Sequence, residues 1–340
     1  MPTFFDSTPS LNDAQVLRTR MRQDGYLFIR RLLPAGQLAA LRLQLLAIAR
    51  DNGWVEKNSP LTEAIADQNG FCVEPTPEYM DAYRPMYALP EFHALQHHPA
   101  LVGLLEKLLD GPVLPHPRLI GRTIFPKRES FTTPPHQDFI PIQGTTETYT
   151  AWFPLHDLPP DMGGLEVAAG SHQGGVYEFS PALGAGGLAI ADPLADTWTG
   201  GPLEAGDVLF FHSMTAHRGL ANTGESLRLS IDARYQRVDA PIAPGSLLPH
   251  SQPNTWENVY LDWPDSNLQY YWRQYELHIT DYDDSYHEKR DRQAMELGAQ
   301  GDRLSVSVLQ RIIARDKDLQ KRQRAAELLA AIEDDETTAL

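Results

Sequence analysis

Residues 113 to 238 consist of short apolar or alternating runs, and this pattern limits the fold more than any other feature of the chain. Gly, Pro, Asn and Asp stand between the runs, and no helical periodicity is interleaved with them. Such a series indicates an antiparallel β-sandwich or barrel. The runs that predict strands are 113–125, 146–158, 163–172, 175–179, 206–217 and 226–236.

The segments on either side of this β-rich region have helical character. Residues 11–50 predict a helix, a short strand and a second helix, and residues 90–111 predict two short helices. Apolar residues recur at helical spacing again in 267–279 and 307–336. We expect one domain in three parts: an N-terminal layer of helices and a strand (1–112), a β core (113–238) and a C-terminal helical extension (239–340).

Composition narrows the class of partner. The chain has 340 residues and a formal net charge of −16, so it lacks the basic surface that nucleic acid or anionic lipid requires. No window reaches the roughly 18–20 apolar residues of a membrane span. Cys72 is the single cysteine, which excludes an intramolecular disulfide and a cysteine-rich zinc site. We expect a cytoplasmic protein whose partner is a small molecule, not nucleic acid or a membrane.

A candidate metal site begins in the stretch TPPHQDFIPIQG. His136 and Asp138 are two positions apart, and in a strand they would point to the same face. A third ligand should come from another strand, and His217 in GDVLFFHSMTAH is the best candidate. Two histidines and one carboxylate with open coordination positions suit non-haem Fe(II). The three residues therefore predict an iron site.

An arginine follows the third candidate ligand at an informative distance. The turn signal ANTG lies at 221–224, and a hairpin folded about it would place Arg228 opposite His217, about 4.8 Å away on the next strand. A guanidinium can hold a carboxylate through two parallel hydrogen bonds. A metal ligand beside a carboxylate anchor fits 2-oxoglutarate as a cosubstrate that chelates the iron.

These motifs together resemble the phytanoyl-CoA dioxygenase family of Fe(II)/2-oxoglutarate oxygenases. The resemblance is carried by HxD, TAWFPLHDLPPDMGGLEVAAGSH, GDVLFFHSMTAH with an arginine eleven residues after the histidine, and DGYLFIRRLLPAGQLAAL near the N-terminus. It covers about residues 20–238. It implies a mostly β fold with flanking helices, in which a double-stranded β-helix (jelly-roll, cupin-like) core packs against N- and C-terminal helices. It also implies Fe(II) as cofactor, and 2-oxoglutarate and O₂ as cosubstrates.

Site roles follow from the same resemblance. It implies that iron is bound by His136, Asp138 and His217, and that 2-oxoglutarate is held by Arg228. Trp152 should lie near the cosubstrate, and the polar residues expected to line the pocket are Thr150, Gln143 and Arg122. One departure is Gly219, since many members carry a small hydroxyl residue two positions after the distal histidine. Either Arg228 works without that second hydrogen bond, or a residue such as Thr150 substitutes for it.

The implied reaction is hydroxylation of an unactivated C–H bond with release of succinate and CO₂. The carboxylate of Asp138 favours hydroxylation over halogenation, because related halogenating enzymes have a small residue there. Desaturation, cyclisation and epimerisation stay open. Two alternatives remain: a cupin-like Zn²⁺ or Mn²⁺ isomerase or hydrolase with the same ligands, and a non-enzymatic small-molecule binding protein. The C-terminal helices are expected either to cover the barrel mouth or to form a homodimer interface.

Overall fold

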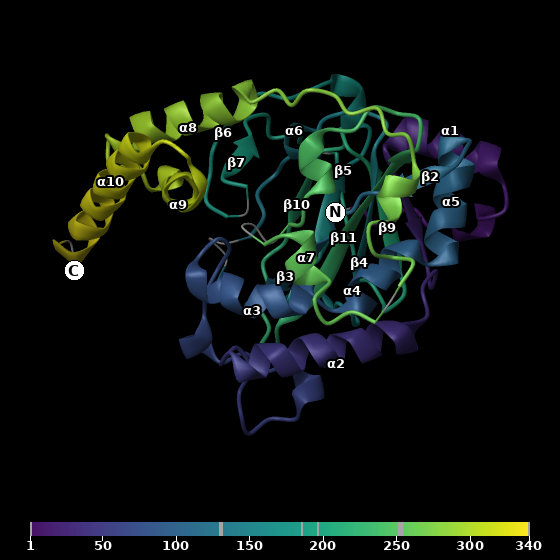
Figure 1. Cartoon of the computed structure of the whole chain (residues 1–340), viewed down its shortest axis with the longest axis horizontal. Coiled ribbons are helices and arrows are strands. Elements are labelled where there is room, and N and C mark those ends of the chain that lie inside the picture. Colours follow the sequence, from purple (N-terminus) through teal and green to yellow (C-terminus); the bar gives the residue numbers. More distant parts are fainter. Residues whose placement is uncertain are drawn as a thin grey trace.

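The computed structural model contains a large antiparallel sheet at its centre (Figure 1). It describes residues 2–128, 132–184, 186–195, 197–250, 254–264 and 266–338, with side chains up to residue 333. The strand order is β1-β9-β4-β11-β2, with β3 also paired to β11. These strands are β1 (Tyr26–Ile29), β2 (Val113–Pro115), β3 (Ile120–Ile124), β4 (Tyr149–Pro154), β9 (Val208–His212) and β11 (Arg228–Arg237).

A smaller sheet has the strand order β10-β5-β8. Apolar side chains of the large sheet, such as Trp152 and Phe211, form one buried cluster with Leu165 and Val167 of β5, so the two sheets face each other. This confirms the expected jelly-roll type of core with flanking helices. The strands of the smaller sheet are β5 (Leu165–Ala168), β8 (Trp198–Thr199) and β10 (His217–Gly219), and a separate hairpin consists of β6 (Phe179–Pro181) and β7 (Leu188–Ile190).

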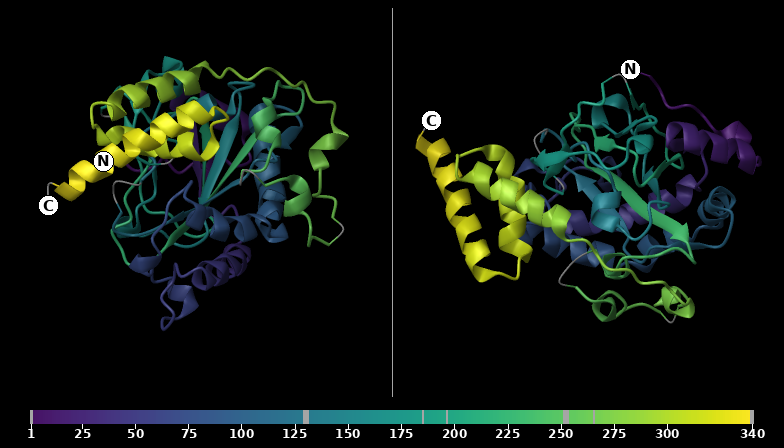
Figure 2. Two further views of the ribbon diagram at one scale, coloured as in Figure 1. Left: turned by 60° about the vertical axis from the view of Figure 1, so that its left-hand side comes forward. Right: turned by 90° about the horizontal axis from the view of Figure 1, so that it is seen from above.

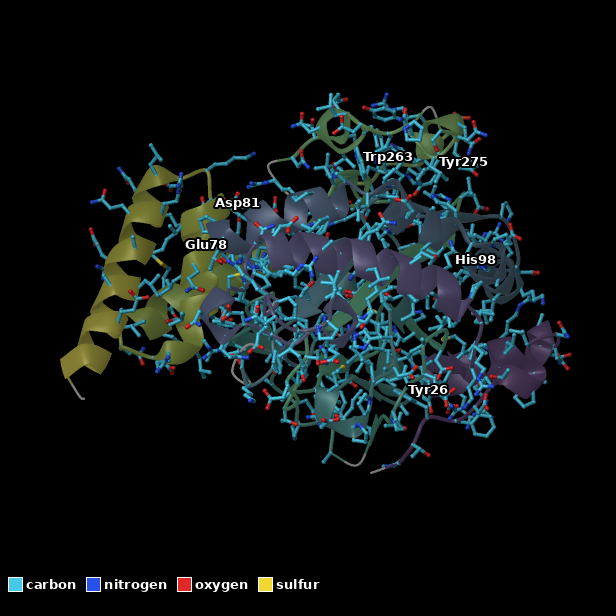
Figure 3. All side chains as sticks on the ribbon, turned by 90° about the horizontal axis from the view of Figure 1, so that it is seen from below. Tyr26, Glu78, Asp81, His98, Trp263 and Tyr275 are labelled. Carbon is cyan, nitrogen blue, oxygen red and sulfur yellow. The ribbon has the colours of Figure 1, made fainter. Side chains whose placement is uncertain are left out.

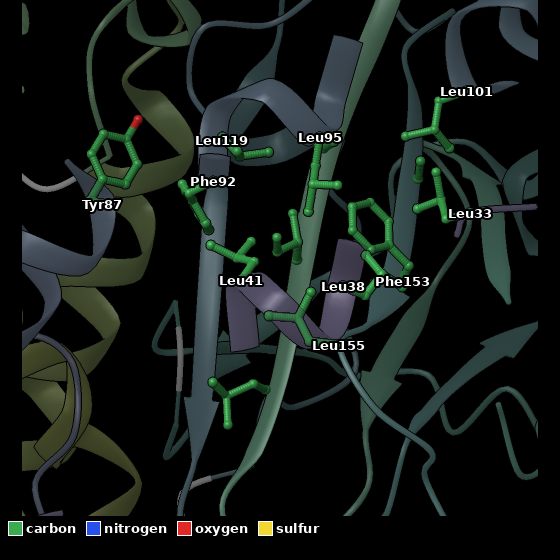
Figure 4. Packing of buried hydrophobic residues seen from close by; sticks show 14 of the residues in the cluster. Leu33, Leu38, Leu41, Tyr87, Phe92, Leu95, Leu101, Leu119, Phe153 and Leu155 are labelled. Carbon is green, nitrogen blue, oxygen red and sulfur yellow. The ribbon is translucent and has the colours of Figure 1, made fainter. Parts of the chain in front are cut away.

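The other face of the large sheet is covered by the N-terminal helices. Helix α1 (Ala14–Asp24) begins where the Asp13 side chain accepts a hydrogen bond from the Val16 amide and ends at Gly25 in the left-handed conformation. Helix α2 (Ala35–Asp51) places Leu38 and Leu41 against side chains of β4 (Figure 4). The remaining helices of this layer are α3 (Pro77–Tyr87), α4 (Pro90–Ala94) and α5 (Pro99–Leu109).

The C-terminal helices form a unit with its own small core. They are α8 (Ser285–Gly298), α9 (Val306–Arg315) and α10 (Leu319–Thr338), and they follow the short helix α7 (Trp256–Val259). Their buried residues, among them Val308, Leu309 and Ile312, pack on one another and not on the main core. Figure 2 shows the three helices together at one end of the molecule. None of the described helices is both long and apolar enough to cross a membrane.

The structure differs from the sequence-based expectation at three places outside the site. Residues 267–279 are not a helix but turns with one 3₁₀ helix at Tyr271–Gln274. The run 307–336 is two helices, since the chain bends between Arg315 and Leu319. Helix α3 was not expected in its proline-rich segment, yet Pro77 takes the first helical turn, where the missing N–H costs nothing. Figure 3 shows Glu78 and Asp81 of α3 on the side of the core nearest the C-terminal helices.

Leu229 tests the packing between β11 and the N-terminal layer. Its side chain is 1% exposed within the main core, so Leu229→Ala should lower the free energy of unfolding by about 2–5 kcal/mol. Leu261 is 78% exposed, and Leu261→Ala should change it by less than about 0.5 kcal/mol. Urea unfolding followed by circular dichroism measures both. Equal effects of the two variants would contradict the described packing.

Candidate active site

The candidate metal ligands come from two segments that are bridged to each other. One segment carries His136 and Asp138, and the other is β10, which begins with His217. His136 and His217 form an antiparallel bridge in which each backbone N–H donates to the other residue's carbonyl at 2.9 Å. Asp138 directly precedes the short helix α6 (Phe139–Ile142). The expectation that HxD lies within a continuous strand is therefore wrong, because the chain turns into α6 after the bridge. The bridge and the turn still bring the three side chains together.

The three side chains have the geometry of a metal site. The Nε2 atoms of His136 and His217 each lie 3.9 Å from Oδ1 of Asp138, and one ligand atom from each residue lies within 4.8 Å of the others. Each Nδ1 faces a backbone carbonyl, of Pro134 at 2.8 Å and Thr215 at 3.0 Å. A nitrogen that faces a carbonyl carries the proton, so both Nε2 lone pairs point to the site.

The surroundings of the two histidines keep them in the protonation state that binds a metal cation. Burial and the neighbouring His217 lower the pKa of His136 to about 3, and burial lowers the pKa of His217. Both imidazoles are therefore neutral at physiological pH, which is the form that binds metal. Two neutral imidazoles and one carboxylate fit a divalent ion of the iron type.

The carboxylate of Asp138 is 2% exposed and is held by two side chains. Arg234 donates from Nη2 to Oδ1 at 2.9 Å and from Nε to Oδ2 at 3.3 Å, and the Thr150 hydroxyl donates to Oδ2 at 2.7 Å. Burial opposes ionisation, but the charge of Arg234 and its hydrogen bonds hold the pKa of Asp138 well below its usual range. The carboxylate is thus charged and fixed in orientation before any ion binds.

An inner cavity lies on one side of these ligands, between the two sheets. Its empty volume is about 400 Å³, and its walls include Thr133, Trp152, Phe211, Gly219, Arg228 and Ser230. The polar wall comes from β11, where alternate residues face inward. Leu229, Ile231 and Ala233 point to the opposite face and belong to the main core.

Arg228 reaches across the inner cavity from the large sheet. Its Nη1 donates to the carbonyls of Leu220 at 3.0 Å and Gly164 at 3.3 Å, while its buried Nε has no hydrogen-bond partner among the described residues. The expected hairpin between His217 and Arg228 is wrong. His217 lies in β10, which pairs with β5, whereas β11 pairs with β2, β3 and β4. The two residues approach because their sheets face each other.

The other predicted pocket residues divide into two groups. Trp152 and Arg122 line the inner cavity, and Arg122 is paired with Asp232 at 3.1 Å. Thr150 is used by Asp138, so its hydroxyl is not free to replace the one that Gly219 lacks. Gln143 is not among the residues lining this cavity; its amide binds the backbone of Asp283, donating to the carbonyl at 2.8 Å and accepting from the N–H at 2.7 Å.

An outer cavity adjoins the inner one. Its empty volume is about 750 Å³, including solvent at its mouth, and its walls include His116, Arg118, Pro141, His250, Arg311 and Arg315. His136, Asp138 and Arg234 line both cavities. Two of the three metal-ligand candidates therefore lie where a smaller inner space meets a larger outer one.

Sequence reasoning missed several features of the site. Ser230, Asp232 and the pairing of Arg234 with Asp138 were not predicted, although the run RLSIDAR alternates polar and apolar residues from Arg228 to Arg234. That alternation is the signal of a strand with one polar face. Thr133 was also missed. Its carbonyl accepts from the Gly219 amide at 2.9 Å, and it lines the inner cavity beside Gly219.

Comparison with known proteins agrees with this arrangement. The family model described as Phytanoyl-CoA dioxygenase (PhyH) matches residues 21–230. The matched part contains the three metal-ligand candidates and Arg228, but it ends before Arg234 and before all of the C-terminal helices.

Individual relatives have low sequence identity to this chain. The 1-deoxypentalenic acid 11-beta-hydroxylase of Streptomyces exfoliatus is 27% identical over 252 residues, which is 68% of this chain and 84% of the relative. The enzyme of the same name from Streptomyces arenae is 28% identical over 251 residues, with the same coverage. Among solved structures, the non-haem alpha-ketoglutarate-dependent carbocyclase SnoK from nogalamycin biosynthesis is 24% identical, with a TM-score of 0.49, over 72% of this chain and 90% of that one.

The hydrogen bond from Thr150 to Asp138 can be tested by metal binding. Thr150→Val keeps the shape of the side chain but removes the donor, so the affinity for Fe(II) or Co(II) should fall by about 10- to 100-fold. Thr150→Ser keeps the donor and should bind nearly as tightly as the wild type. Calorimetric titration under anaerobic conditions measures these affinities. An unchanged affinity in Thr150→Val would show that the hydroxyl does not position the ligand.

Proposed function

The chain belongs to the phytanoyl-CoA dioxygenase family of non-haem oxygenases, and on this premise we propose that it hydroxylates an unactivated C–H bond of a small molecule. In this reaction 2-oxoglutarate is oxidised to succinate and CO₂. Fe(II) is the cofactor, and 2-oxoglutarate and O₂ are the cosubstrates. His136, Asp138 and His217 would hold the iron, which supplies O₂ activation and the oxidising power that the protein side chains lack.

The observation that carries this proposal is the pairing of the metal ligands with Arg228 in one buried cavity. Three guanidiniums line the inner cavity, but only two carboxylates do. Arg234 is paired with Asp138 and Arg122 with Asp232. Among the described residues, Arg228 forms no ion pair, and its buried Nε has no hydrogen-bond partner. The inner cavity thus lacks one anion, in the place where the far carboxylate of 2-oxoglutarate would lie.

The orientation of Arg228 also favours this ligand. Because Nη1 is anchored on the carbonyls of Leu220 and Gly164, the edge formed by Nε and Nη2 is left for a carboxylate. Gly219 leaves space next to it, since a Cβ there would be 3.7 Å from Nη2. Burial and the charge of Arg122 lower the pKa of Arg228 to about 10, so it stays protonated at neutral pH.

The outer cavity is our proposal for the substrate site. It shares His136 and Asp138 with the inner cavity but not Arg228, so a substrate bound there would lie beside the iron without occupying the proposed cosubstrate site. Two relatives are named as hydroxylases, which supports hydroxylation as the outcome. A zinc or manganese isomerase or hydrolase would give the unpaired Arg228 no role. The described geometry favours the oxygenase for that reason.

Turnover of the cosubstrate tests the proposal directly. The wild-type protein with Fe(II), O₂ and 2-oxoglutarate should release succinate, because the proposed reaction converts 2-oxoglutarate to succinate and CO₂. Asp138→Ala and His217→Ala should lose this activity, because each removes a metal ligand. Succinate is measured by mass spectrometry against a reaction without iron. Undiminished succinate release by both variants would refute the ligand assignment.

Arg228→Gln should weaken 2-oxoglutarate binding. Loss of a charge-assisted pair costs about 1.5–3 kcal/mol, which is roughly a 10- to 100-fold rise in Kd. The matched control is Arg237→Gln on the same strand, because Arg237 pairs with the exposed Asp239 outside the cavity and should leave Kd unchanged. Anaerobic calorimetry of the Fe(II)-loaded proteins measures both. Similar Kd values for the two variants would contradict the role of Arg228.

A further inference from the structure

The outer cavity has an unusual excess of positive charge for a protein with a net charge of −16. Glu74 and Asp138 are the carboxylate side chains among its described walls. Three histidines also line it: His116, His250 and the metal-ligand candidate His136. The guanidinium groups that line the cavity are those of Arg118, Arg122, Arg234, Arg311 and Arg315.

Three of these five arginines have a carboxylate partner. Arg234 is paired with Asp138, and Arg122 with Asp232. Arg315 of α9 donates from Nη2 to Oε1 of Glu74 at 3.0 Å. Glu74 is shared further, because Nε2 of His250 and Nη1 of Arg122 each lie 3.9 Å from one of its oxygens. Its charge is therefore already distributed over several partners.

Arg118 and Arg311 form no ion pair with a carboxylate among the described residues, although the charge of Glu74 acts on both. Both side chains are half-buried, and the Nε of Arg311 is buried without a hydrogen-bond partner there. Burial and the neighbouring Arg315 lower the pKa of Arg311 to about 9, and burial lowers the pKa of Arg118. Because Glu74 is already paired with Arg315, one carboxylate serves several guanidiniums, and a bound anion would stabilise them. The same feature, a buried Nε without a partner, marks Arg228 in the inner cavity.

Helix α9 is fixed in the position that brings Arg311 to the cavity. Near its start, the Ser307 hydroxyl accepts from the Gly184 amide at 2.9 Å, and at its end Arg315 is paired with Glu74. Arg311 lies between these two anchors, one turn before Arg315. The helix lies outside residues 21–230, to which the family model is matched. This wall of the cavity is thus added by the C-terminal extension.

We propose that the outer cavity binds an anionic group of the substrate, a carboxylate or a phosphate, through Arg311 of α9 together with Arg118 of the core. This inference rests on the proposed function, because it assigns the substrate class of the same site. The C-terminal helices then select the substrate by its charge. Arg118 and Arg311 bind the anion, and the Glu74–Arg315 pair positions α9.

The test uses small probes of known charge on the Fe(II)-loaded protein, saturated with 2-oxoglutarate under anaerobic conditions. Saturation keeps the probes away from Arg228. The probes are benzoate, inorganic phosphate and neutral benzamide, each titrated by calorimetry. Wild-type protein should bind benzoate or phosphate at least tenfold more tightly than benzamide. Preference for benzoate identifies a carboxylate substrate, and preference for phosphate identifies a phosphate ester.

Substitutions of Arg311 test whether this residue binds the anion. Arg311→Gln should weaken binding of the preferred anion about tenfold or more, and Arg311→Lys should restore part of it. Arg292→Gln removes the same charge from the exposed side of α8 and should have no effect. Thermal unfolding of all three variants checks that they fold. Equal binding of anions and benzamide, or unchanged anion binding by a folded Arg311→Gln, would overturn the proposal.

Failure of this inference is distinguishable from failure of the proposed function. Binding of 2-oxoglutarate to the same Fe(II)-loaded samples is measured first, before any probe is added. If 2-oxoglutarate binds but no anion is preferred, the oxygenase proposal stands and the substrate class is wrong. If 2-oxoglutarate itself does not bind, the proposed function fails.

Discussion

The buried negative charge of Asp138 is the constraint on which the rest of the site depends. A carboxylate that is 2% exposed would be protonated or destabilising unless cations and donors surround it. Arg234 of β11 and the Thr150 hydroxyl of β4 meet this requirement. The position of one carboxylate therefore ties two strands of the large sheet to the segment that carries HxD.

Strand β11 contributes to both the main core and the inner cavity because its apolar and polar residues alternate. Its apolar residues, such as Leu229 and Ile231, pack against the N-terminal helices, and its polar residues, such as Arg228 and Arg234, face the interior between the sheets. Because successive side chains in a strand point to opposite faces, the same ten residues complete the main core and build the charged wall of the site. The main core and the proposed cosubstrate site therefore depend on the same strand.

The site as a whole is balanced for ligands that carry negative charge. On the inner side, Arg228 is left without an acidic partner, and on the outer side Arg118 and Arg311 are left without one among the described residues. These cations line two cavities that share His136 and Asp138. Under the proposed function, this arrangement would hold an anionic cosubstrate and an anionic substrate beside the same ion, as a reaction between them requires.

Local chemistry could be read from the sequence. The sequence was sufficient to predict the antiparallel core, the first helix and the three residues that meet as metal-ligand candidates, because residue type and strand alternation act over a few positions. Which side chains meet across the molecule was decided by the tertiary structure. Arg234 and Asp138 are 96 residues apart, and Arg315 and Glu74 are 241 apart. His217 and Arg228 approach from facing sheets and not along one hairpin. Local periodicity carries no information on such pairings, because they depend on how the chain crosses between sheets and where the C-terminal helices dock.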